Sequence, residues 1–259
     1  MFTCVFCDFT SAKSIYDFIM LTVSSLSYAY GLKSRPSLTD VSFQVGSGVT
    51  VLMGENGAGK STLMRCIQGE LKPRPGTQIS YEGSEAPSYL PQDPRWIGRY
   101  KVIDLLRYSA WWRGVPSSER ARRIAEVIAE FSLSDLAEKR LNELSGGQYR
   151  RVMLAQSVCA RPSVVLLDEP LTGLDVGARE SLINCVAQLG RSRVVVVSTH
   201  EVEVFEPVAD YVVILRGGRC GFAGKMSDVT REITDSVSGE KSTSLLRVLY
   251  DRVYQGNSS

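Results

Sequence analysis

The chain has 259 residues, of which 44% are hydrophobic and 22% charged, as is ordinary for a globular protein with an ample core. Its formal net charge of +2 gives no reason to expect a nucleic acid or an anionic membrane surface as the main partner. The longest apolar runs have only the length of a strand, well short of the roughly 18–20 residues that span a bilayer. We therefore expect any action at a membrane to pass through another polypeptide.

The N-terminal stretch differs in character from the rest of the chain. Residues 1–19 lack the charged start, apolar centre and small-residue cleavage site of a signal peptide, and β-rich alternation begins abruptly at Met20. We expect residues 1–19 to be a non-native or disordered extension, with the natural start at Met20. The six cysteines are scattered, which favours a reduced compartment, and we interpret the CxxC of Cys4 and Cys7 as incidental.

Short strands and turns are predicted for residues 21–51, and a glycine-rich loop comes after them. Residues 49–53, VTVLM, are apolar on both faces, as in a buried parallel strand. Strand, glycine loop and helix in that order is the context that a phosphate-binding loop requires. The loop matches GxxxxGK[ST] in full, and we expect nucleotide contacts from Gly54, Glu55, Asn56, Gly57, Ala58, Gly59, Lys60, Ser61 and Thr62.

Two side chains of this loop have predicted roles of their own. The glycines let successive backbone N–H groups turn inward around a β-phosphate, and the adjoining helix adds its positive end. Lys60 is expected to reach the β- and γ-phosphates, and the Ser61 hydroxyl is expected to be a ligand of Mg²⁺.

A helical insert is predicted for residues of about 94–150. Ser117 and Ser118 stand where a helix cap is wanted, and apolar residues recur at helical spacing at positions 124, 127, 128 and 131. Strands and helices then alternate as βαβ units up to a hairpin turn at residues 216–219. The tail is expected to hold one helix, with its apolar face at residues 245–253.

Two acidic residues end the buried strand predicted at residues 163–168. The ends of strands are where open α/β sheets place their ligands. Asp168 is predicted to hold Mg²⁺, directly or through water, and Glu169 to act as general base or to position the attacking water. His200, the chain's single histidine, comes after the strand at residues 193–198, so we expect it at the same edge, where it could sense or stabilise a γ-phosphate.

The string Leu144-Ser145-Gly146-Gly147-Gln148 resembles the signature motif of ATP-binding-cassette (ABC) ATPases. A serine and two glycines at a helix start also form an anion trap, with free N–H groups and a favourable dipole. Because the chain already has one complete phosphate cradle, a second makes sense if it binds the γ-phosphate of a nucleotide held by another subunit. In the resembled family two domains pack head to tail around two ATP molecules.

The resemblance covers residues 20–224 and implies roles for further residues. Tyr30 matches the aromatic residue that stacks on adenine, with Tyr28 as a close competitor. Gln92 matches the glutamine that touches Mg²⁺ and relays nucleotide state to the partner. Asp175 matches a contact to the opposing subunit, and His200 matches the family's histidine switch.

The resemblance implies an α/β fold with a P-loop NTPase parallel sheet, an N-terminal antiparallel β layer and an inserted helical subdomain. The ABC ATPase domain would span residues 20–224, and residues 225–259 would form a short tail. The implied cofactors are ATP and Mg²⁺. The implied partners are a second ABC ATPase subunit, as a homodimer by default, and a polytopic membrane permease, with no nucleic acid and no direct contact to the transported substrate.

Two functions are compatible with this resemblance. One is a transporter motor at the cytoplasmic face of the cell membrane. The other is a soluble cassette ATPase acting in ribosome, DNA or iron–sulfur assembly processes. The single cassette and the absence of a long coiled coil in the sequence argue against this second function. The tail is too short for the regulatory domain of many sugar importers, and residues 105–108 and 198–203 resemble stand-alone efflux cassettes, so efflux is favoured.

All three tryptophans, Trp96, Trp111 and Trp112, lie between Gln92 and the signature motif. In the resembled family a helix of the membrane subunit docks in this region, and exposed aromatic side chains are good anchors for it. The alternative is that they fill the core of the helical insert. For Trp111 and Trp112 both interpretations stay open, since adjacent helical residues cannot all face the same way.

Overall fold

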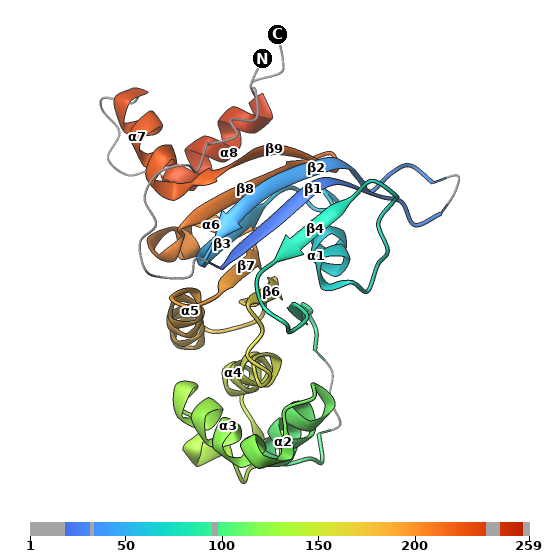
Figure 1. Cartoon of the computed structure of the whole chain (residues 1–259). Coiled ribbons are helices and arrows are strands. Elements are labelled where there is room, and N and C mark those ends of the chain that lie inside the picture. The colour runs from blue at the N-terminus through green and yellow to red at the C-terminus, as the bar shows by residue number, and fades with distance from the viewer. Residues whose placement is uncertain (1–18, 32–33, 95–97, 237–243, 256–259) are drawn as a thin grey trace, which may run out of the picture.

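The structure is a computed structural model that describes residues 19–31, 34–94, 98–236 and 244–255. In this part of the chain two sheets lie above a helical lobe (Figure 1). The smaller sheet is antiparallel, in the order β2 (Leu38–Gly46), β1 (Met20–Tyr28) and β4 (Gln78–Tyr81). The predicted N-terminal antiparallel layer is thereby confirmed.

The larger sheet has six strands, of which β5, β6, β7, β3 and β8 run parallel and β9 is antiparallel to β8. Every residue of its three central strands is buried, as their unbroken apolar runs predict. The strands are, in sheet order, β5 (Ser88–Leu90), β6 (Val164–Asp168), β7 (Val194–Ser198), β3 (Gly48–Met53), β8 (Tyr211–Arg216) and β9 (Arg219–Lys225).

Alternate side chains of the central strands belong to two different cores. Val164 and Leu166 of β6 pack with the antiparallel sheet and with α1 (Lys60–Gln68). Val165 and Leu167 face the other way and pack with α4 (Gly146–Ser157), α5 (Val176–Gly190) and the insert. The parallel sheet is therefore covered on both faces, which leaves its strand ends as the accessible edge.

The helical lobe is built from α2 (Val102–Trp112) and α3 (Ser117–Glu130), then the 3₁₀ turns η1 (Ser134–Leu136) and η2 (Leu141–Glu143), and finally α4. The prediction that Ser117 or Ser118 caps α3 is wrong. The carbonyl of Pro116 already accepts the backbone N–H groups of Glu119 and Arg120, so the helix begins at Ser117 without a side-chain cap.

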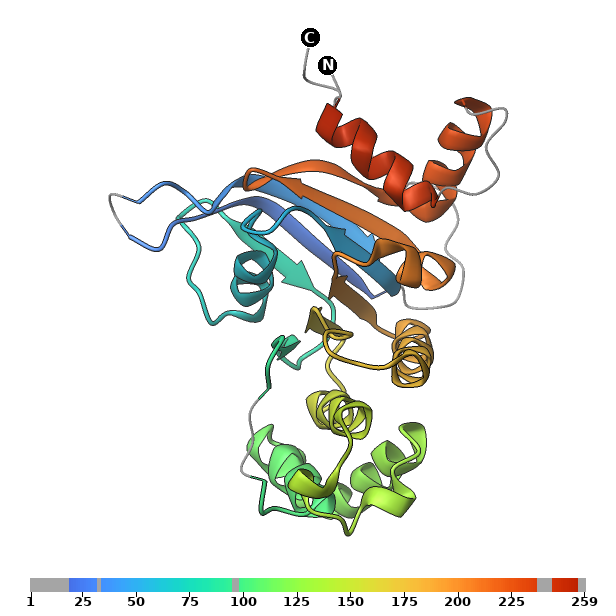
Figure 2. The same cartoon turned by 180° about the vertical axis from the view of Figure 1, so that it is seen from behind.

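The chain after β9 forms two helices instead of the predicted one. Helix α8 (Leu245–Gln255) has the expected apolar face, with Leu246 and Leu249 buried. Helix α7 (Met226–Ser236) was missed because its sequence is rich in polar and β-branched residues, yet Met226 and Val229 are buried at helical spacing. Both helices lie on the outer side of β8 and β9 (Figure 2).

Several predictions fall outside the described residues, namely those on residues 1–18, with Cys4 and Cys7, and on Trp96. Of the cysteines that the structure does describe, Cys66, Cys159 and Cys185 are free thiols. Among the described helices, none combines the length and the apolar character that crossing a bilayer requires.

Candidate functional site

The glycine-rich loop joins β3 to α1, which begins at Lys60 directly after Gly59. Gly59 has a φ of 102°, in the left-handed region, and a Cβ there would lie 2.7 Å from Leu38 Cδ2 and 2.9 Å from the Ser37 carbonyl oxygen. At Gly54, with a φ of 153°, a Cβ would lie 2.6 Å from the carbonyl oxygen of Leu215. At both positions glycine is needed, because the backbone has a positive φ and because there is no room for a Cβ atom.

The ammonium group of Lys60 is buried inside this loop. Its Nζ donates to the carbonyl oxygen of Gly54 at 2.7 Å and to that of Glu55 at 3.2 Å. Burial lowers the pKa of Lys60, while the nearby charges of Glu169 and Asp168 oppose that shift. An ammonium held by neutral carbonyl groups is ready to exchange them for phosphate oxygens, with which its hydrogen bonds are stronger.

Asp168 ends β6 as a buried carboxylate that is held by two hydroxyl groups. Tyr89 donates to Oδ2 at 2.9 Å, and Ser198 donates to Oδ1 at 2.5 Å. Burial and the charge of Asp168 raise the pKa of Tyr89. Neither partner was predicted from the sequence, although Tyr89 stands three residues before Gln92 and Ser198 two residues before His200.

Glu169 and His200 lie together at the same edge. The Oε2 atom of Glu169 is 2.9 Å from Nδ1 of His200, so their predicted proximity is confirmed. Glu169 has a φ of 45°, and its backbone N–H contacts the carbonyl oxygen and the Oγ of Ser198. A non-glycine residue in this conformation carries backbone strain that the surrounding contacts must maintain.

Gln92 comes after β5, which pairs with β6, so it lies close to the acidic end of β6. Gln92 is exposed, and its carbonyl oxygen accepts from Arg150 of α4. Tyr149, which stands where the resembled family more often has a basic or polar residue, donates to the carbonyl oxygen of Pro94 at 2.7 Å. Both α4 side chains tie the segment after β5 to the helix that begins at the signature motif.

The two candidate adenine-stacking residues differ in exposure. Tyr28 is half-buried at the end of β1, whereas Tyr30 is 58% exposed, and their rings meet edge to face at 5.1 Å. The Tyr30 hydroxyl lies 3.1 Å from Oγ1 of Thr62, in the first turn of α1. Tyr30 is therefore the accessible ring beside the phosphate loop, and its stacking on adenine stays a prediction.

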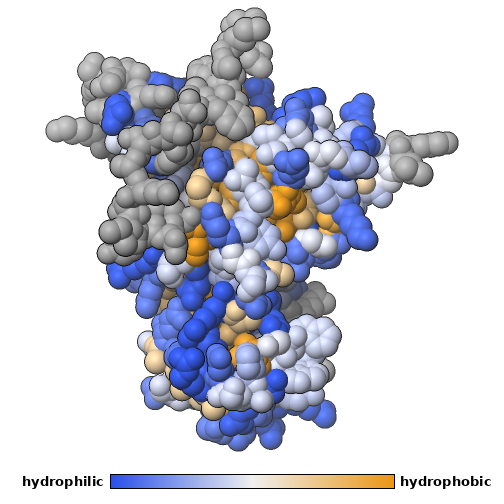
Figure 3. Space-filling view, viewed as in Figure 1, coloured by the Kyte–Doolittle hydropathy of each residue, from blue (hydrophilic) through white to orange (hydrophobic). Residues whose placement is uncertain are grey.

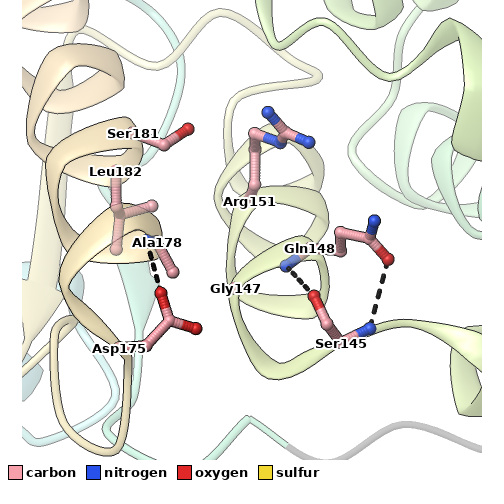
Figure 4. Close-up of a pocket in the computed structure, with 8 residues that line it drawn as sticks. All are labelled: Ser145, Gly147, Gln148, Arg151, Asp175, Ala178, Ser181 and Leu182. Carbon is pink, nitrogen blue, oxygen red and sulfur yellow. Dashed lines mark hydrogen bonds between the residues drawn. The ribbon is translucent and has the colours of Figure 1, made fainter.

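The signature motif lies apart from the phosphate loop. Ser145 caps α4 in a capping box: its Oγ accepts from the backbone N–H of Gln148, whose side chain accepts from the backbone N–H of Ser145. Leu144 is half-buried against the core. A pocket of about 260 Å³ opens beside this helix start (Figure 4), lined by Ser145, Gly147, Gln148, Arg151, Asp175, Ala178, Ser181 and Leu182. None of these lining residues belongs to the phosphate loop.

Across this pocket, Asp175 caps α5 by accepting from the backbone N–H of Ala178 at 2.9 Å (Figure 4). A Cβ on Gly147 would lie 2.5 Å from the Cβ of Ala178, whereas the nearest atom to a Cβ on Gly146 is 3.9 Å away, in Leu174. Gly147 is thus required by the close approach of α4 and α5 within the chain, a packing role that the motif alone does not indicate.

The predicted Mg²⁺ ligands Ser61, Gln92 and Asp168 offer hydroxyl, amide and carboxylate oxygens, which are the donors that Mg²⁺ prefers. The described residues contain no cluster of three or more His, Cys, Asp or Glu side chains that could hold a metal ion. This is compatible with Mg²⁺, because nucleotide sites hold it through one or two carboxylates, substrate phosphates and water. The side chains at this edge therefore fit a Mg²⁺–nucleotide complex.

A glycine loop between a buried parallel strand and a helix, with acidic residues ending a neighbouring strand, defines a P-loop NTPase. The sequence profile described as "ABC transporter" matches residues 38–172. The uncharacterised ABC transporter ATP-binding protein YxlF of Bacillus subtilis (strain 168) is 30% identical over 219 residues, covering 82% of this chain and 73% of its own length. The chain belongs to the ABC transporter family and carries its ATP-binding domain.

Two further comparisons agree with this membership. The cobalt import ATP-binding protein CbiO of Rhodobacter capsulatus is 34% identical over 219 residues, covering 77% of this chain and 76% of its own. A solved structure, described as the ATP-binding subunit of an ABC transporter, is 27% identical with a TM-score of 0.73, covering 93% of this chain and 100% of its own. The predicted ABC ATPase fold is thereby confirmed.

Proposed function

We propose that the chain is the ATP-binding and ATP-hydrolysing subunit of an ABC transporter, and that it energises transport through a separate membrane subunit. The observation that carries this proposal is one sheet edge that combines the buried Lys60 ammonium, the braced carboxylate of Asp168 and the Glu169–His200 pair. The three groups match the needs of phosphate binding, metal binding and activation of water.

In the proposed site the loop N–H groups and Lys60 bind the phosphates, and Tyr30 stacks on the adenine. Ser61, Gln92 and Asp168 would hold Mg²⁺, which when bound supplies neutralisation of the phosphate charge. Glu169 accepts a proton from the attacking water or orients that water. His200 holds the Glu169 carboxylate from one side and contacts the γ-phosphate from the other.

The proposed active unit is a dimer of two such chains, by default a homodimer. Its support is the second anion-binding helix start, which lines a pocket separate from the phosphate loop of its own chain. In the dimer each γ-phosphate is held by Lys60 of one subunit and by Ser145 and Gly147 of the other, while Asp175 contacts the opposing subunit. ATP binding then closes the dimer, and hydrolysis reopens it.

An aromatic cluster on α2 supports a membrane-subunit partner at the cytoplasmic face. Trp111 and Trp112 are 54% and 70% exposed, so the alternative that this pair fills the core of the insert is wrong. Tyr108 packs beside both, with its ring stacked on Trp112 at a centroid distance of 6.2 Å. On the face shown in Figure 3, hydrophilic residues cover much of the helical lobe, and exposed aromatic rings in such a setting suit a docking helix.

The direction of transport is a separate prediction. Efflux rests on the likeness of residues 105–108 and 198–203 to stand-alone efflux cassettes. The Rhodobacter relative is named for cobalt import, so import is the competing assignment. The proposal of an ATP-driven transport subunit does not depend on this choice.

The experiment that tests the proposal is affinity purification of tagged Glu169→Gln protein with Mg·ATP from detergent-solubilised membranes. We expect a polytopic membrane protein to co-purify, and to be lost when Trp111→Ser and Trp112→Ser are added to the same background. Recovery from the soluble fraction only, with ribosomal or assembly proteins attached, would overturn the transport role in favour of a soluble cassette ATPase.

A further inference from the structure

The last turn of α8 reaches the phosphate loop, 199 residues earlier in the chain. The Tyr254 hydroxyl accepts from the backbone N–H of Glu55 at 3.2 Å and donates to the carbonyl oxygen of Leu215 at 2.8 Å. This carbonyl is the one that leaves no room for a Cβ on Gly54. The hydroxyl therefore joins the start of the loop to the end of β8 and uses its donor and one acceptor position to do so.

The ring that carries this hydroxyl is itself held in place. Tyr250 stacks on it at a centroid distance of 4.4 Å, and the Arg216 guanidinium lies 5.3 Å from its centroid. Arg216 also donates to the carbonyl oxygen of Val253 at 3.0 Å. A Cβ on Gly221 of β9 would come within 2.9 Å of Val253 Cγ1, so the helix packs tightly on the sheet here.

The other end of α8 is anchored to Glu206, in the turn η3 (Glu206–Val208) that comes after α6 (Val202–Phe205). Its carboxylate accepts from the backbone N–H groups of Leu245 and Leu246 at 3.1 and 3.3 Å, and from Ser244 Oγ. A carboxylate at a helix N-terminus is favourable for the helix dipole. Glu206 lies six residues after His200, so α8 links the segment after the histidine to the phosphate loop.

Glu55, the loop residue that Tyr254 contacts, also contacts the lysine of the loop. Glu55 contacts Tyr254 through its N–H, while its carbonyl oxygen accepts from Lys60 Nζ. We propose that Tyr254 is a positioning residue for the phosphate loop, and that α8, docked between Glu206 and Glu55, keeps the Gly54–Glu55 segment oriented for Lys60. This inference rests on the proposed function in one respect, that the loop binds ATP.

The test is Tyr254→Phe, which removes the hydroxyl and keeps the stacked ring. The matched control is Tyr81→Phe, which removes the hydroxyl of a half-buried tyrosine on β4. For Tyr254→Phe we expect the backbone amides of residues 54–60 to exchange with solvent roughly 2- to 10-fold faster without nucleotide, as for the loss of one net hydrogen bond. The KM for ATP should rise by a similar factor with little change in kcat, while Tm stays near the wild-type value.

The outcomes separate this inference from the proposed function. Should wild-type protein fail to bind ATP, the proposed function fails, and amide exchange still decides whether Tyr254 orders the loop. Unchanged exchange and unchanged KM in Tyr254→Phe would overturn the inference. Faster exchange across the whole chain together with a lower Tm would also overturn it, because Tyr254 would then be only a stabilising residue. An equal effect of the control Tyr81→Phe would count against the hydroxyl contact in the same way.

Discussion

The starts of α1 and α4 are two solutions to the same physical problem. Each presents free backbone N–H groups and the positive end of a helix, with glycine beside it. At α1 a buried lysine and the acidic end of β6 surround the helix start. At α4 the capping box of Ser145 and Gln148 already satisfies some of the backbone N–H groups at the helix start. The pocket beside this helix start is lined by residues of α4 and α5 and by the residues that cap these helices. In the proposed mechanism the first site performs the chemistry. The second site, where the carboxylate of Asp175 caps α5, binds the γ-phosphate of a nucleotide held by the other chain.

Among the variants that test this difference between the starts of α1 and α4, Glu169→Gln is expected to have the largest effect. Loss of a general base should slow ATP turnover by roughly 10²–10⁴-fold while ATP binding persists. Phosphate release and nucleotide binding measure the two quantities. Glu203→Gln, at an exposed carboxylate three residues after His200, is the control and should turn over normally. Near-normal turnover in Glu169→Gln would refute Glu169 as the base.

The next largest effect is expected from Lys60→Met, which removes the cation from the first site. Loss of charge-assisted hydrogen bonds to phosphate should weaken ATP binding about 10- to 100-fold. Calorimetric titration with Mg·ATP measures this change. Without nucleotide, Tm should not fall, because the variant removes a buried charge whose desolvation outweighs the nearby charges of Glu169 and Asp168. A folded variant that binds ATP as tightly as the wild type would show that Lys60 does not contact the phosphates.

The lowered pKa of Lys60 predicts that the stability of the protein depends on pH. Burial lowers the pKa of Lys60 below its ordinary value of 10.5, so between the lowered value and 10.5 the unfolded chain binds more protons than the folded chain. The contribution of Lys60 to the free energy of unfolding should therefore rise with pH in that window. Denaturant melts of wild type and Lys60→Met across this range measure it, and the free energy of unfolding of the wild type should rise relative to that of the variant as pH rises. A constant difference would contradict the shift.

A smaller effect, on stability, separates the two signature glycines. Gly147→Ala places a Cβ 2.5 Å from that of Ala178 and should destabilise the fold by about 1–3 kcal/mol, lowering Tm by roughly 2–12 °C. Gly146→Ala has room for its Cβ and should leave Tm near the wild-type value. Equal Tm values for the two variants would show that Gly147 has no packing role between α4 and α5.

The smallest effect is expected at Asp175. Asp175→Ala removes the cap of α5 and should cost about 1 kcal/mol, whereas Asp175→Asn keeps a capping oxygen and should preserve stability. If Asp175 also contacts the opposing subunit, Asp175→Asn should weaken ATP-dependent dimerisation at unchanged Tm. Thermal melts and size-exclusion chromatography of both variants on the Glu169→Gln background measure this difference. Unchanged dimerisation in Asp175→Asn would show that the charge of Asp175 has no role at the interface.

The elements predicted correctly are those whose signal is carried by neighbouring residues. The strands at residues 49–53 and 163–168 were found because parallel strands buried on both faces have unbroken apolar runs. Helix α7 was missed because its buried residues are few and its composition is polar. The sequence favours a serine cap for α3, but in the fold Pro116 occupies the N-cap position and its carbonyl oxygen accepts the first backbone N–H groups of the helix.

The phosphate loop, the acidic strand end, the signature motif and the α/β class could all be found without coordinates, because each depends on residue types at fixed short spacing. The partners of those motifs became known only from the folded chain. Tyr89 and Ser198 on Asp168, Ala178 against Gly147, and Tyr254 on the loop all come from other elements of the chain. Such contacts have no spacing rule, since the packing of helices on the sheet brings together groups that lie far apart in sequence.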